Sequence, residues 1–315
     1  MFEETIHAHD NVLVTGGTGT LGGALIPELL KRTPHVRVLS RDEAKQDVLR
    51  RTYPGVDFML GDVRDPKACI DSVRDVDMVI HCASLKYVDV SEKQPSEYIL
   101  TNVIGTLNLI NAVLMTGQVK QMIGISTDKA AAPYNTYGLT KALLEKLFIE
   151  AHAYRRSPVC DTIFTVCRYG NVIGSRGSVV LKWQELVQQG KPIKVTDPHM
   201  TRFFFTVEDA LRLIDHALWI NQGGVVVAQA MPSCTLGDLA SLWSETYEII
   251  GTRPGEKYHE DLLTEHEMPR VQKDDDYFIY SPLGPAGGEI DEPYTSASAR
   301  RLSRVELDAM TLQWR

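Results

Sequence analysis

Short apolar runs alternate with amphipathic stretches along the first half of the chain. The runs expected to form strands are Asn11–Thr15, His35–Leu39, Val56–Leu60, Asp77–Ala83 and Gln121–Ile125. Buried strands that alternate with helices are typical of a parallel sheet covered on both faces. The pattern therefore predicts an α/β protein with a doubly wound parallel sheet, in which ligands bind beyond the carboxyl ends of the strands.

The second half repeats this pattern less regularly. We expect a core strand over Thr162–Arg168, a helix over Val207–Trp219 and a strand over Val225–Ala230. From Lys273 the sequence is rich in Asp, Gly and Pro, so it predicts an extended tail that ends in a short helix around Ser303–Leu312.

A chain of 315 residues suits one large domain or two intimately joined ones. The strand pattern predicts a nucleotide-binding domain over residues 1–168, to which residues 203–230 return. Residues 169–202 and 231–315 are then left to form a smaller substrate-binding region.

Composition narrows the classes of partner. The net charge is -8, so broad attraction to nucleic acid or to an anionic membrane is not expected. No apolar run looks long enough to cross a bilayer, and the start, MFEETIHAHD, lacks the apolar segment of a signal peptide. The five cysteines show no metal or redox spacing. We therefore expect a reduced, cytoplasmic protein without a metal site.

A glycine-rich turn follows the first expected strand directly and opens a helix. Its glycines at 16, 19 and 22 permit a tight turn, close approach of the backbone to a pyrophosphate, and close packing of helix on strand. The amino end of the helix offers free amides and a favourable dipole to the phosphates. This arrangement predicts a dinucleotide site.

The end of the second strand bears on which dinucleotide binds. A carboxylate at this position is typical of NAD sites, whereas the 2'-phosphate of NADP needs a cation. Arg41, with Ser40 and Lys45 beside it, favours NADP. Asp42 and Glu43 follow at once, and they are the reason to keep NAD as the alternative.

The stretch after the fifth expected strand carries the densest chemistry. Thr127, Asp128 and Lys129 come directly after the strand, and Tyr137 and Lys141 stand four residues apart on one helix face. A phenol has a pKa near ~10, and a neighbouring ammonium favours the phenolate and lowers that pKa. Tyr137 is therefore expected to act as an acid and base, with Thr127 offering its hydroxyl to a substrate oxygen.

Simpler interpretations of the same residues exist. A lone Tyr-x-x-x-Lys occurs by chance in many helices, and Asp128 with Lys129 has the pattern of a solvated ion pair. The predicted topology favours catalysis, because it brings the glycine-rich turn and Thr127 to the same edge of the sheet.

The second half supplies candidates for substrate binding. The loop RYGNVIGSRGSVV sets Asn171, Arg176 and Ser178 among small, flexible residues. Arg202 and Arg253 lie beside Pro and Gly turns, and guanidinium groups match the oxygens of a diphosphate. Each of these arginines taken alone is more often a surface or ion-pair residue.

Six motifs occur in order across nearly the whole chain: TGGTGTLG, STDKA, YGLTK, RYGNVIGSRGSV, MTRFF and RPGEKYHE. The chain resembles the extended short-chain dehydrogenase/reductases, which have a Rossmann fold. Within them it is similar to the soluble UDP-N-acetylglucosamine 4,6-dehydratases that invert C5. Related dTDP-glucose dehydratases carry Glu where this chain has Lys129. One departure is Ala83-Ser84-Leu85-Lys86, where the family tends to have Ala-Ala-Leu-Lys.

The resemblance implies a lyase that depends on NADP, acts on a UDP-hexosamine and feeds the synthesis of a surface sugar such as pseudaminic acid. Tyr137 would remove the C4 hydroxyl proton, Thr127 would hydrogen-bond the C4 oxygen, and Lys141 would hold the cofactor ribose. Lys129, with a lowered pKa, would take the C5 proton, and protonated Asp128 would donate to the departing C6 hydroxyl.

The expected cofactor contacts are Gly16, Thr18, Gly19, Thr20, Leu21, Ser40, Arg41, Lys45, Asp62, Val63, Ala83, Ser84, Tyr137 and Lys141. The expected substrate contacts are Lys86, Asn171, Arg176, Ser178, Val179, Arg202, Arg253 and Glu256. The resemblance also implies a homo-oligomer, a dimer or a hexamer, with the helices near Asn102 and Tyr137 at a dimer interface. Two alternatives stay open: a nucleotide-sugar 4-epimerase, which would leave Asp128 and Lys129 idle, and a non-catalytic NADP-binding regulator.

Overall fold

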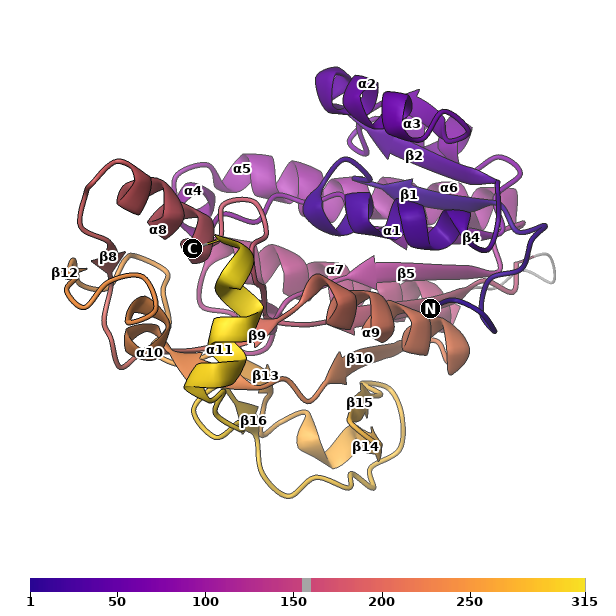
Figure 1. The fold of residues 1–315 in the computed structure, drawn as a ribbon. Helices are drawn as coiled ribbons and strands as arrows, with labels where there is room; N and C mark the ends of the chain where they lie inside the picture. Colours follow the sequence, from indigo (N-terminus) through magenta and orange to yellow (C-terminus); the bar gives the residue numbers. More distant parts are fainter. Residues whose placement is uncertain (155–159, 315) are drawn as a thin grey trace.

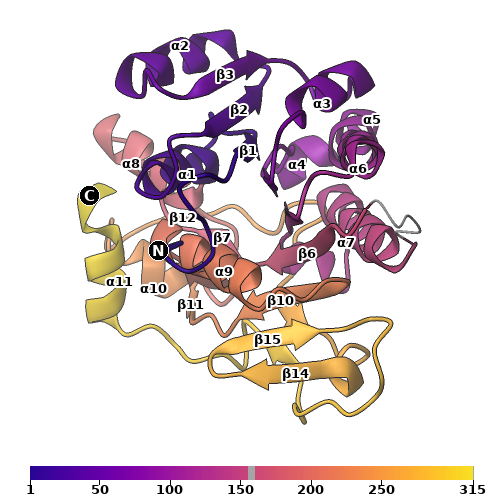
Figure 2. The same cartoon turned by 90° about the vertical axis from the view of Figure 1, so that its right-hand side faces the viewer.

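A nine-stranded sheet runs through the molecule in the order β14-β15-β10-β6-β5-β4-β1-β2-β3, seen edge-on in Figure 2. The computed structural model describes residues 1–154 and 160–314. The strands of this sheet are β1 (Val12–Thr15), β2 (Val36–Ser40), β3 (Asp57–Leu60), β4 (Met78–His81), β5 (Gln121–Ile125), β6 (Ile163–Arg168), β10 (Val225–Gln229), β14 (Val271–Asp274) and β15 (Tyr277–Tyr280).

The strands from β3 across to β10 pair in parallel, and the strand order reverses between β1 and β4. A crevice opens beyond the carboxyl ends of the strands at such a reversal, and ligands of doubly wound sheets bind there. The predicted α/β fold with a doubly wound parallel sheet is confirmed.

Helices cover both faces of the sheet (Figure 1). They are α1 (Thr20–Leu30), α2 (Glu43–Thr52), α3 (Pro66–Ser72), α4 (Val88–Ser91), α5 (Pro95–Tyr98), α6 (Gly105–Thr116), α7 (Thr136–Tyr154), α8 (Val179–Gln188), α9 (Val207–Trp219), α10 (Leu236–Ala240) and α11 (Arg304–Thr311). A π-helix, Ile99–Ile104, joins α5 to α6.

Alternate residues of each central strand belong to two different cores. In β1, Val12 and Val14 pack in the core that includes α1 and α9, whereas Leu13 packs in the core that includes α6 and α7. Successive side chains of a strand point to opposite faces, so an apolar run is needed where both faces are covered. This is why the strands of the first half could be found as short apolar runs.

A third core lies in the second half, around Trp183 and Trp243. The strands near it form small sheets: β11-β9-β7, β12-β8 and β13-β16. Their bounds are β7 (Asn171–Val172), β8 (Lys194–Val195), β9 (Thr201–Phe205), β11 (Ser233–Thr235), β12 (Glu248–Ile249), β13 (Asp261–Leu263) and β16 (Tyr294–Thr295).

The predicted extended tail from Lys273 is wrong in its first part. Strands β14 and β15 form an antiparallel hairpin, and β15 pairs antiparallel with β10, so the range 231–315 also extends the main sheet. The turn between them contains Asp275 at φ 49°, a left-handed conformation that aspartate tolerates better than most residues. The run of aspartates therefore marks a tight turn. The final helix is present as α11.

A buried guanidinium ties the two halves together. Arg168, at the end of β6, is 1% exposed and forms two hydrogen bonds of 2.6 and 2.9 Å with Glu145 of α7. It forms two more, of 2.8 and 3.0 Å, with Glu267, and donates to the carbonyl of Leu262 at 2.9 Å. Glu145 also accepts a 2.6 Å hydrogen bond from Ser126, the first residue after β5.

Replacing Arg168 with Leu should destabilise the fold strongly, because Glu145 and Glu267 would remain buried without a cation. Breaking a buried pair in this way costs about 3–5 kcal/mol. Arg212→Leu is the matched control, since it removes an exposed pair with Asp209, worth ~0.2–1 kcal/mol. Urea unfolding followed by circular dichroism gives both values, and equal losses would show that the Arg168 network does not hold the fold together.

Candidate functional site

The glycine-rich turn lies where β1 meets α1, beside the point at which the strand order reverses. Gly16 has φ +67°, and a Cβ on it would lie 2.8 Å from the Cα of Ala83. A Cβ on Gly22 would lie 2.4 Å from the Cα of Gly17. Only glycine fits both positions, so the backbone forms the close cradle that a pyrophosphate needs. The residues present therefore fit a dinucleotide.

Residues predicted around the dinucleotide line the neighbouring strand ends. Arg41 is half exposed after β2, and its guanidinium lies 3.6 Å from the carboxylate of Asp62, after β3. Ser40 is buried and accepts a hydrogen bond from the side-chain amide of Gln46 at 3.0 Å. Val63 is buried in a core, so its side chain packs within the protein.

The carboxylate of Asp42 is used within the protein. It accepts a hydrogen bond from the backbone amide of Lys45 at 3.0 Å, which caps α2, and it also pairs with the Lys45 ammonium. Lys45 is therefore turned toward Asp42. Arg41 is left as the exposed charge beside it at the end of β2.

Four of the predicted catalytic side chains gather at the end of β5. Thr127 donates a 2.9 Å hydrogen bond to Asp128, and Lys129 donates a 3.0 Å hydrogen bond to the same oxygen, Oδ1. The Tyr137 phenol lies close enough to Thr127 and Lys129 for both to act on its pKa. All four come from a short segment around β5 and from the first turn of α7, and all are largely shielded from solvent.

The pKa of Tyr137 differs from the prediction that a neighbouring ammonium lowers it. Burial raises the pKa of Tyr137 to about 12, although Lys129 and Thr127 act in the opposite direction. Lys141 is not the cation that lowers it, because its ammonium donates to the carbonyl of Ile125. Burial lowers the pKa of Lys141 to about 8. In this state Tyr137 is a protonated phenol, a donor to a substrate oxygen.

The Lys129 ammonium lies between two buried carboxylates. It is 3.0 Å from Asp128 Oδ1 and 3.2 Å from Glu260 Oε1, and its side chain is 14% exposed. The Oδ2 atom of Asp128 is buried and has no hydrogen-bond partner among the described residues. A buried polar atom without a partner is uncommon, and this oxygen lies against Gly170, where an added Cβ would be 3.2 Å from it.

The charges in this cluster shift the acid–base properties of each member. Burial raises the pKa of Asp128, and Glu260 adds to this effect while Lys129 opposes it. Burial alone would lower the pKa of Lys129, but the two carboxylates outweigh it and hold that pKa above its ordinary value. The lowered pKa expected for Lys129 is therefore wrong for this state, whereas the raised pKa of Asp128 suits a proton donor.

Polar contacts fix the helix that carries Tyr137. Asn102, in the π-helix, is fully buried and bonds to both backbone groups of Leu85, after β4, and to the hydroxyl of Thr140. Thr140 in turn donates to the carbonyl of Tyr137 at 2.8 Å. Asn135 caps α7 through the amide of Gly138. The orientation of Tyr137 is therefore set by residues on three separate segments.

The loop after β7 reaches the glycine-rich turn. Arg176 donates from its backbone amide to Thr20 Oγ1 at 3.2 Å and from its guanidinium to the carbonyl of Thr18 at 3.0 Å. Lys86 lies against the same loop, 3.4 Å from Ser175 Oγ. Arg176, predicted at the substrate, is thus placed at the cofactor turn.

Other predicted substrate residues line the same side of the second half. Asn171 donates to the carbonyl of Phe203 at 3.3 Å. Ser178, just before α8, has a buried hydroxyl without a hydrogen-bond partner among the described residues, and Val179 opens that helix.

The two arginines predicted for a diphosphate differ. Arg202 is 6% exposed, and its guanidinium is hydrogen-bonded to Glu256 at 3.0 Å and to three backbone carbonyls, those of Thr201, Lys257 and Tyr258. These partners occupy most of its donors. Arg253 is half exposed and lies 3.5 Å from Glu256, so it is the accessible one.

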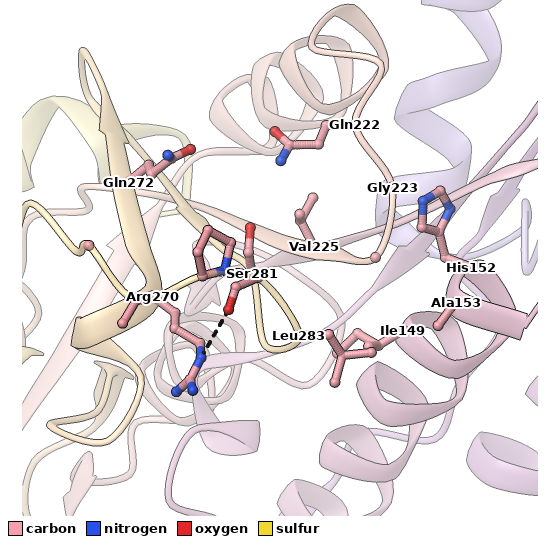
Figure 3. Close-up of a pocket in the computed structure, with 15 residues that line it drawn as sticks. Ile149, His152, Ala153, Gln222, Gly223, Val225, Arg270, Gln272, Ser281 and Leu283 are labelled. Carbon is pink, nitrogen blue, oxygen red and sulfur yellow. Dashed lines mark hydrogen bonds between the residues drawn. The ribbon is translucent and has the colours of Figure 1, made fainter.

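A separate cavity of about 420 Å³ lies away from these residues (Figure 3). Its lining includes His152 near the end of α7, Val225 at the start of β10, and Arg270 just before β14. The starts of parallel strands lie at the opposite edge from their carboxyl ends, so this cavity is not part of the candidate site.

Sequence reasoning missed Glu260, Asn102 as an anchor, and the Glu145–Arg168 pair. Glu260 is the last letter of the RPGEKYHE motif, so a signal for it was present. The polar residues Asn102 and Glu145 lie in otherwise apolar helical stretches, which is a signal for buried hydrogen bonding. Their partners are distant in the sequence, and nothing local identifies them.

One prediction about membranes needs correction. The helical segment Pro95–Thr116 is long and apolar enough to cross a bilayer by length and composition, the one such helix among the described residues. Buried positions make up 44% of its most apolar window, and its polar members Asn102 and Thr106 are hydrogen-bonded inside the fold. These contacts are typical of a helix that packs within a protein.

Comparisons with known proteins agree with this geometry. The family model described as polysaccharide biosynthesis protein matches residues 12–282. A UDP-glucose 4-epimerase of Rickettsia conorii is 36% identical over 326 residues, covering 96% of this chain and 95% of that protein. An uncharacterized membrane protein of Methanocaldococcus jannaschii, MJ1061, is 36% identical over 326 residues, covering 98% and 97%.

Among solved structures, Pen from Bacillus thuringiensis has a TM-score of 0.91 and 34% sequence identity, covering 98% of this chain and 99% of that one. The resemblance to the extended short-chain dehydrogenase/reductases that the six motifs carry is confirmed. The chain belongs to the polysaccharide biosynthesis protein family and has the fold of an extended short-chain dehydrogenase/reductase.

Proposed function

We propose that this protein is an NADP-dependent UDP-N-acetylglucosamine 4,6-dehydratase that inverts C5 and serves surface-glycan synthesis of the pseudaminic-acid type. The coarser class, an enzyme of the nucleotide-sugar dehydratase/epimerase type, agrees with the family and the fold. The observation that carries the finer proposal is the buried Asp128–Lys129 pair, joined at 3.0 Å beside Thr127 and Tyr137. An acid and a base at this position are what an elimination requires.

The first step is oxidation at C4. Thr127 and Tyr137 lie close to each other and can both bind the C4 oxygen. Tyr137 takes the hydroxyl proton as the phenolate, so the proton that burial keeps on its phenol in this structure must leave first. Lys141, four residues along the same helix face, would hold the cofactor ribose. Bound NADP would supply the hydride acceptor at C4 and later the hydride donor at C6.

The second step is loss of water across C5 and C6. A ketone at C4 acidifies the C5 proton, which Lys129 removes. Asp128, whose pKa is raised by burial, gives its proton to the departing C6 hydroxyl. Oδ2 of Asp128 has no hydrogen-bond partner among the described residues, so it is the oxygen that can carry this proton.

Two arginines and the amino end of a helix are available for the diphosphates of the substrate and the cofactor. Arg253 is the accessible arginine of the second half, with Glu256 orienting it. Ser178 and Val179 lie at the amino end of α8, which favours an anion. Arg176 reaches the glycine-rich turn and serves the cofactor. We propose residues 1–168 with 203–230 as the cofactor side and 169–202 with 231–315 as the substrate side, with Arg176 reaching across to the cofactor.

A second candidate is a nucleotide-sugar 4-epimerase. The Rickettsia conorii relative that carries the name UDP-glucose 4-epimerase favours it, at 36% identity over nearly the whole chain. Thr127, Tyr137 and Lys141 would suffice for that reaction. Asp128, Lys129 and Glu260 would then be a buried ion cluster without a chemical role, which is a costly arrangement. A non-catalytic NADP-binding regulator would need neither the three residues of the epimerase reaction nor the buried ion cluster.

We also propose a cytoplasmic homo-oligomer. Exposed apolar side chains gather on the outer faces of the π-helix with α6 and of α7: Ile99, Leu100, Ile104, Leu107, Leu139 and Leu143. Apolar surface of this kind is typical of contacts between subunits. Sedimentation velocity measures the assembly, and a monomer at all concentrations would contradict it.

The product of UDP-N-acetylglucosamine tests the function directly. A dehydratase releases a product lighter than the substrate by one water, with a 4-keto-6-deoxy sugar, whereas an epimerase releases an isomer of equal mass. We expect the lighter product in mass spectrometry of the reaction. UDP-glucose is the second substrate to compare, because an isomer formed from it would support the epimerase.

Arg41→Ala should weaken binding of NADP roughly ten- to hundred-fold, because a charge-assisted hydrogen bond contributes about 1.5–3 kcal/mol. Binding of NAD should change little, since it lacks the 2'-phosphate. Arg51→Ala, an exposed arginine on α2, is the matched control. Titration calorimetry with both cofactors measures these constants, and tighter binding of NAD by the wild-type protein would reject the preference.

Lys129→Met should stop dehydration while leaving cofactor binding intact. Loss of a general base lowers turnover by about 10²–10⁴-fold. Oxidation at C4 uses Tyr137 and should persist, seen as reduced cofactor that accumulates on adding substrate. Lys146→Met, on the same helix as Tyr137, serves as the control. A near-normal rate of product release in Lys129→Met would assign the base to another residue.

A further inference from the structure

Glu260 is a buried carboxylate that none of the predicted roles uses. It directly precedes β13, and its backbone amide donates a hydrogen bond to Ser296 Oγ at 2.8 Å. Its side chain is 3% exposed. Oε1 lies 3.2 Å from Lys129 Nζ and 3.8 Å from Arg202 Nε, and Oε2 is buried without a hydrogen-bond partner among the described residues.

The fold alone does not account for this carboxylate. Burying a charge is costly unless it is well paired, and Arg202 already has Glu256 at 3.0 Å as its closer carboxylate. The shorter contact of Glu260 is with Lys129. A buried anion held against the amine that faces the reaction points to a role in the proton transfer.

On the basis of the proposed dehydration, we infer that Glu260 is a positioning residue for Lys129. It orients the amine toward C5 and stabilises the ammonium that forms when the amine takes the C5 proton. The carboxylate of a serine-protease triad acts on its imidazole in the same way, by orienting the base and stabilising its charged form.

Lys129 can become a neutral base by a proton transfer within the cluster of Lys129, Asp128 and Glu260, with no proton exchanged with solvent. Transfer of one proton from Lys129 to Asp128, across their 3.0 Å hydrogen bond, gives a neutral amine and a carboxylic acid. In the elimination, Lys129 takes the proton from C5. The electron pair of the broken C5–H bond forms the C5–C6 double bond. The C6–O bond breaks, and the oxygen leaves as water with the Asp128 proton. Lys129 ends as an ammonium and Asp128 as a carboxylate, the charges they had before the first proton transfer.

Glu260 is the negative charge that stays constant through this cycle. The charged or titratable groups that face Lys129 are Asp128, Glu260, Arg202 and Tyr137. Burial alone would raise the pKa of Glu260, but Lys129 and Arg202 outweigh it and hold that pKa below its ordinary value. The pKa of Asp128 is shifted the opposite way. Two carboxylates with opposite shifts indicate two roles, a proton donor and a fixed anion.

Glu260→Gln tests the inference, because it keeps the shape of the side chain and removes the charge. Release of the dehydrated product should fall by about 10–10³-fold, the range seen when one electrostatic stabiliser is lost. Reduction of the cofactor in the first turnover should keep its rate, since it uses Tyr137. Asp261→Asn is the matched control, because Asp261 is the next residue along the chain and pairs with Lys257 at 2.7 Å, not with Lys129. Glu260→Asp should recover part of the lost rate.

A merely structural role predicts a different result. Glu260→Gln would then slow cofactor reduction and product release alike, or Asp261→Asn would reproduce its effect. Either outcome would overturn the inference.

Labelling of Lys129 gives a readout that does not depend on turnover. Trace acetic anhydride acetylates only neutral amines, so the pH dependence of Lys129 labelling, read by mass spectrometry, reports its protonation. Removing the Glu260 charge should move the midpoint to lower pH, and Asp261→Asn should leave it in place. An unchanged midpoint in Glu260→Gln would overturn the coupling of Glu260 to Lys129. If the midpoint shifts in Glu260→Gln but the wild-type protein never forms a dehydrated product, the proposed function alone is overturned.

Discussion

The buried guanidinium of Arg168 fixes the geometry on which the candidate site depends. Through Glu145 it reaches Ser126, the residue that precedes the reactive Thr127 segment, and through Leu262 and Glu267 it holds the chain just after Glu260. Segments far apart in the sequence are thereby locked to the end of one strand. The contact of Lys129 with Glu260 at 3.2 Å follows from this connection. Rigid support of this kind is what a precise acid–base site requires.

The sheet and the cofactor turn could be predicted because their signals are local. Strands buried on both faces appear as apolar runs, and the glycines of the turn are fixed by close backbone approach at Gly16 and Gly22. The hairpin of β14 and β15 was missed because its aspartates resemble a loop, although they form its turn. Glu260 was missed because its partner, Lys129, is distant in the sequence, and only the fold brings them together.

The protonation of the site was the weakest part of the sequence-based account. A cation near a phenol should lower its pKa, but burial of Tyr137 has the larger effect, and Lys141 is bound to a backbone carbonyl. Lys129 is held charged by two carboxylates, where a free amine was expected. The groups are therefore arranged as a neutralised cluster, and proton transfer within the cluster, from Lys129 to Asp128, offers a route to the reactive state.

The central claim is that Lys129 and Asp128 carry out an elimination through C5. The most direct measurement is proton NMR of the product that the wild-type protein forms from UDP-N-acetylglucosamine in deuterated water. Removal and return of the C5 proton at this site should place one solvent deuteron at C5 of a 4-keto-6-deoxy sugar. A product that keeps its original hydrogen at C5 would contradict the account, because neither 4-epimerisation nor simple oxidation touches that position.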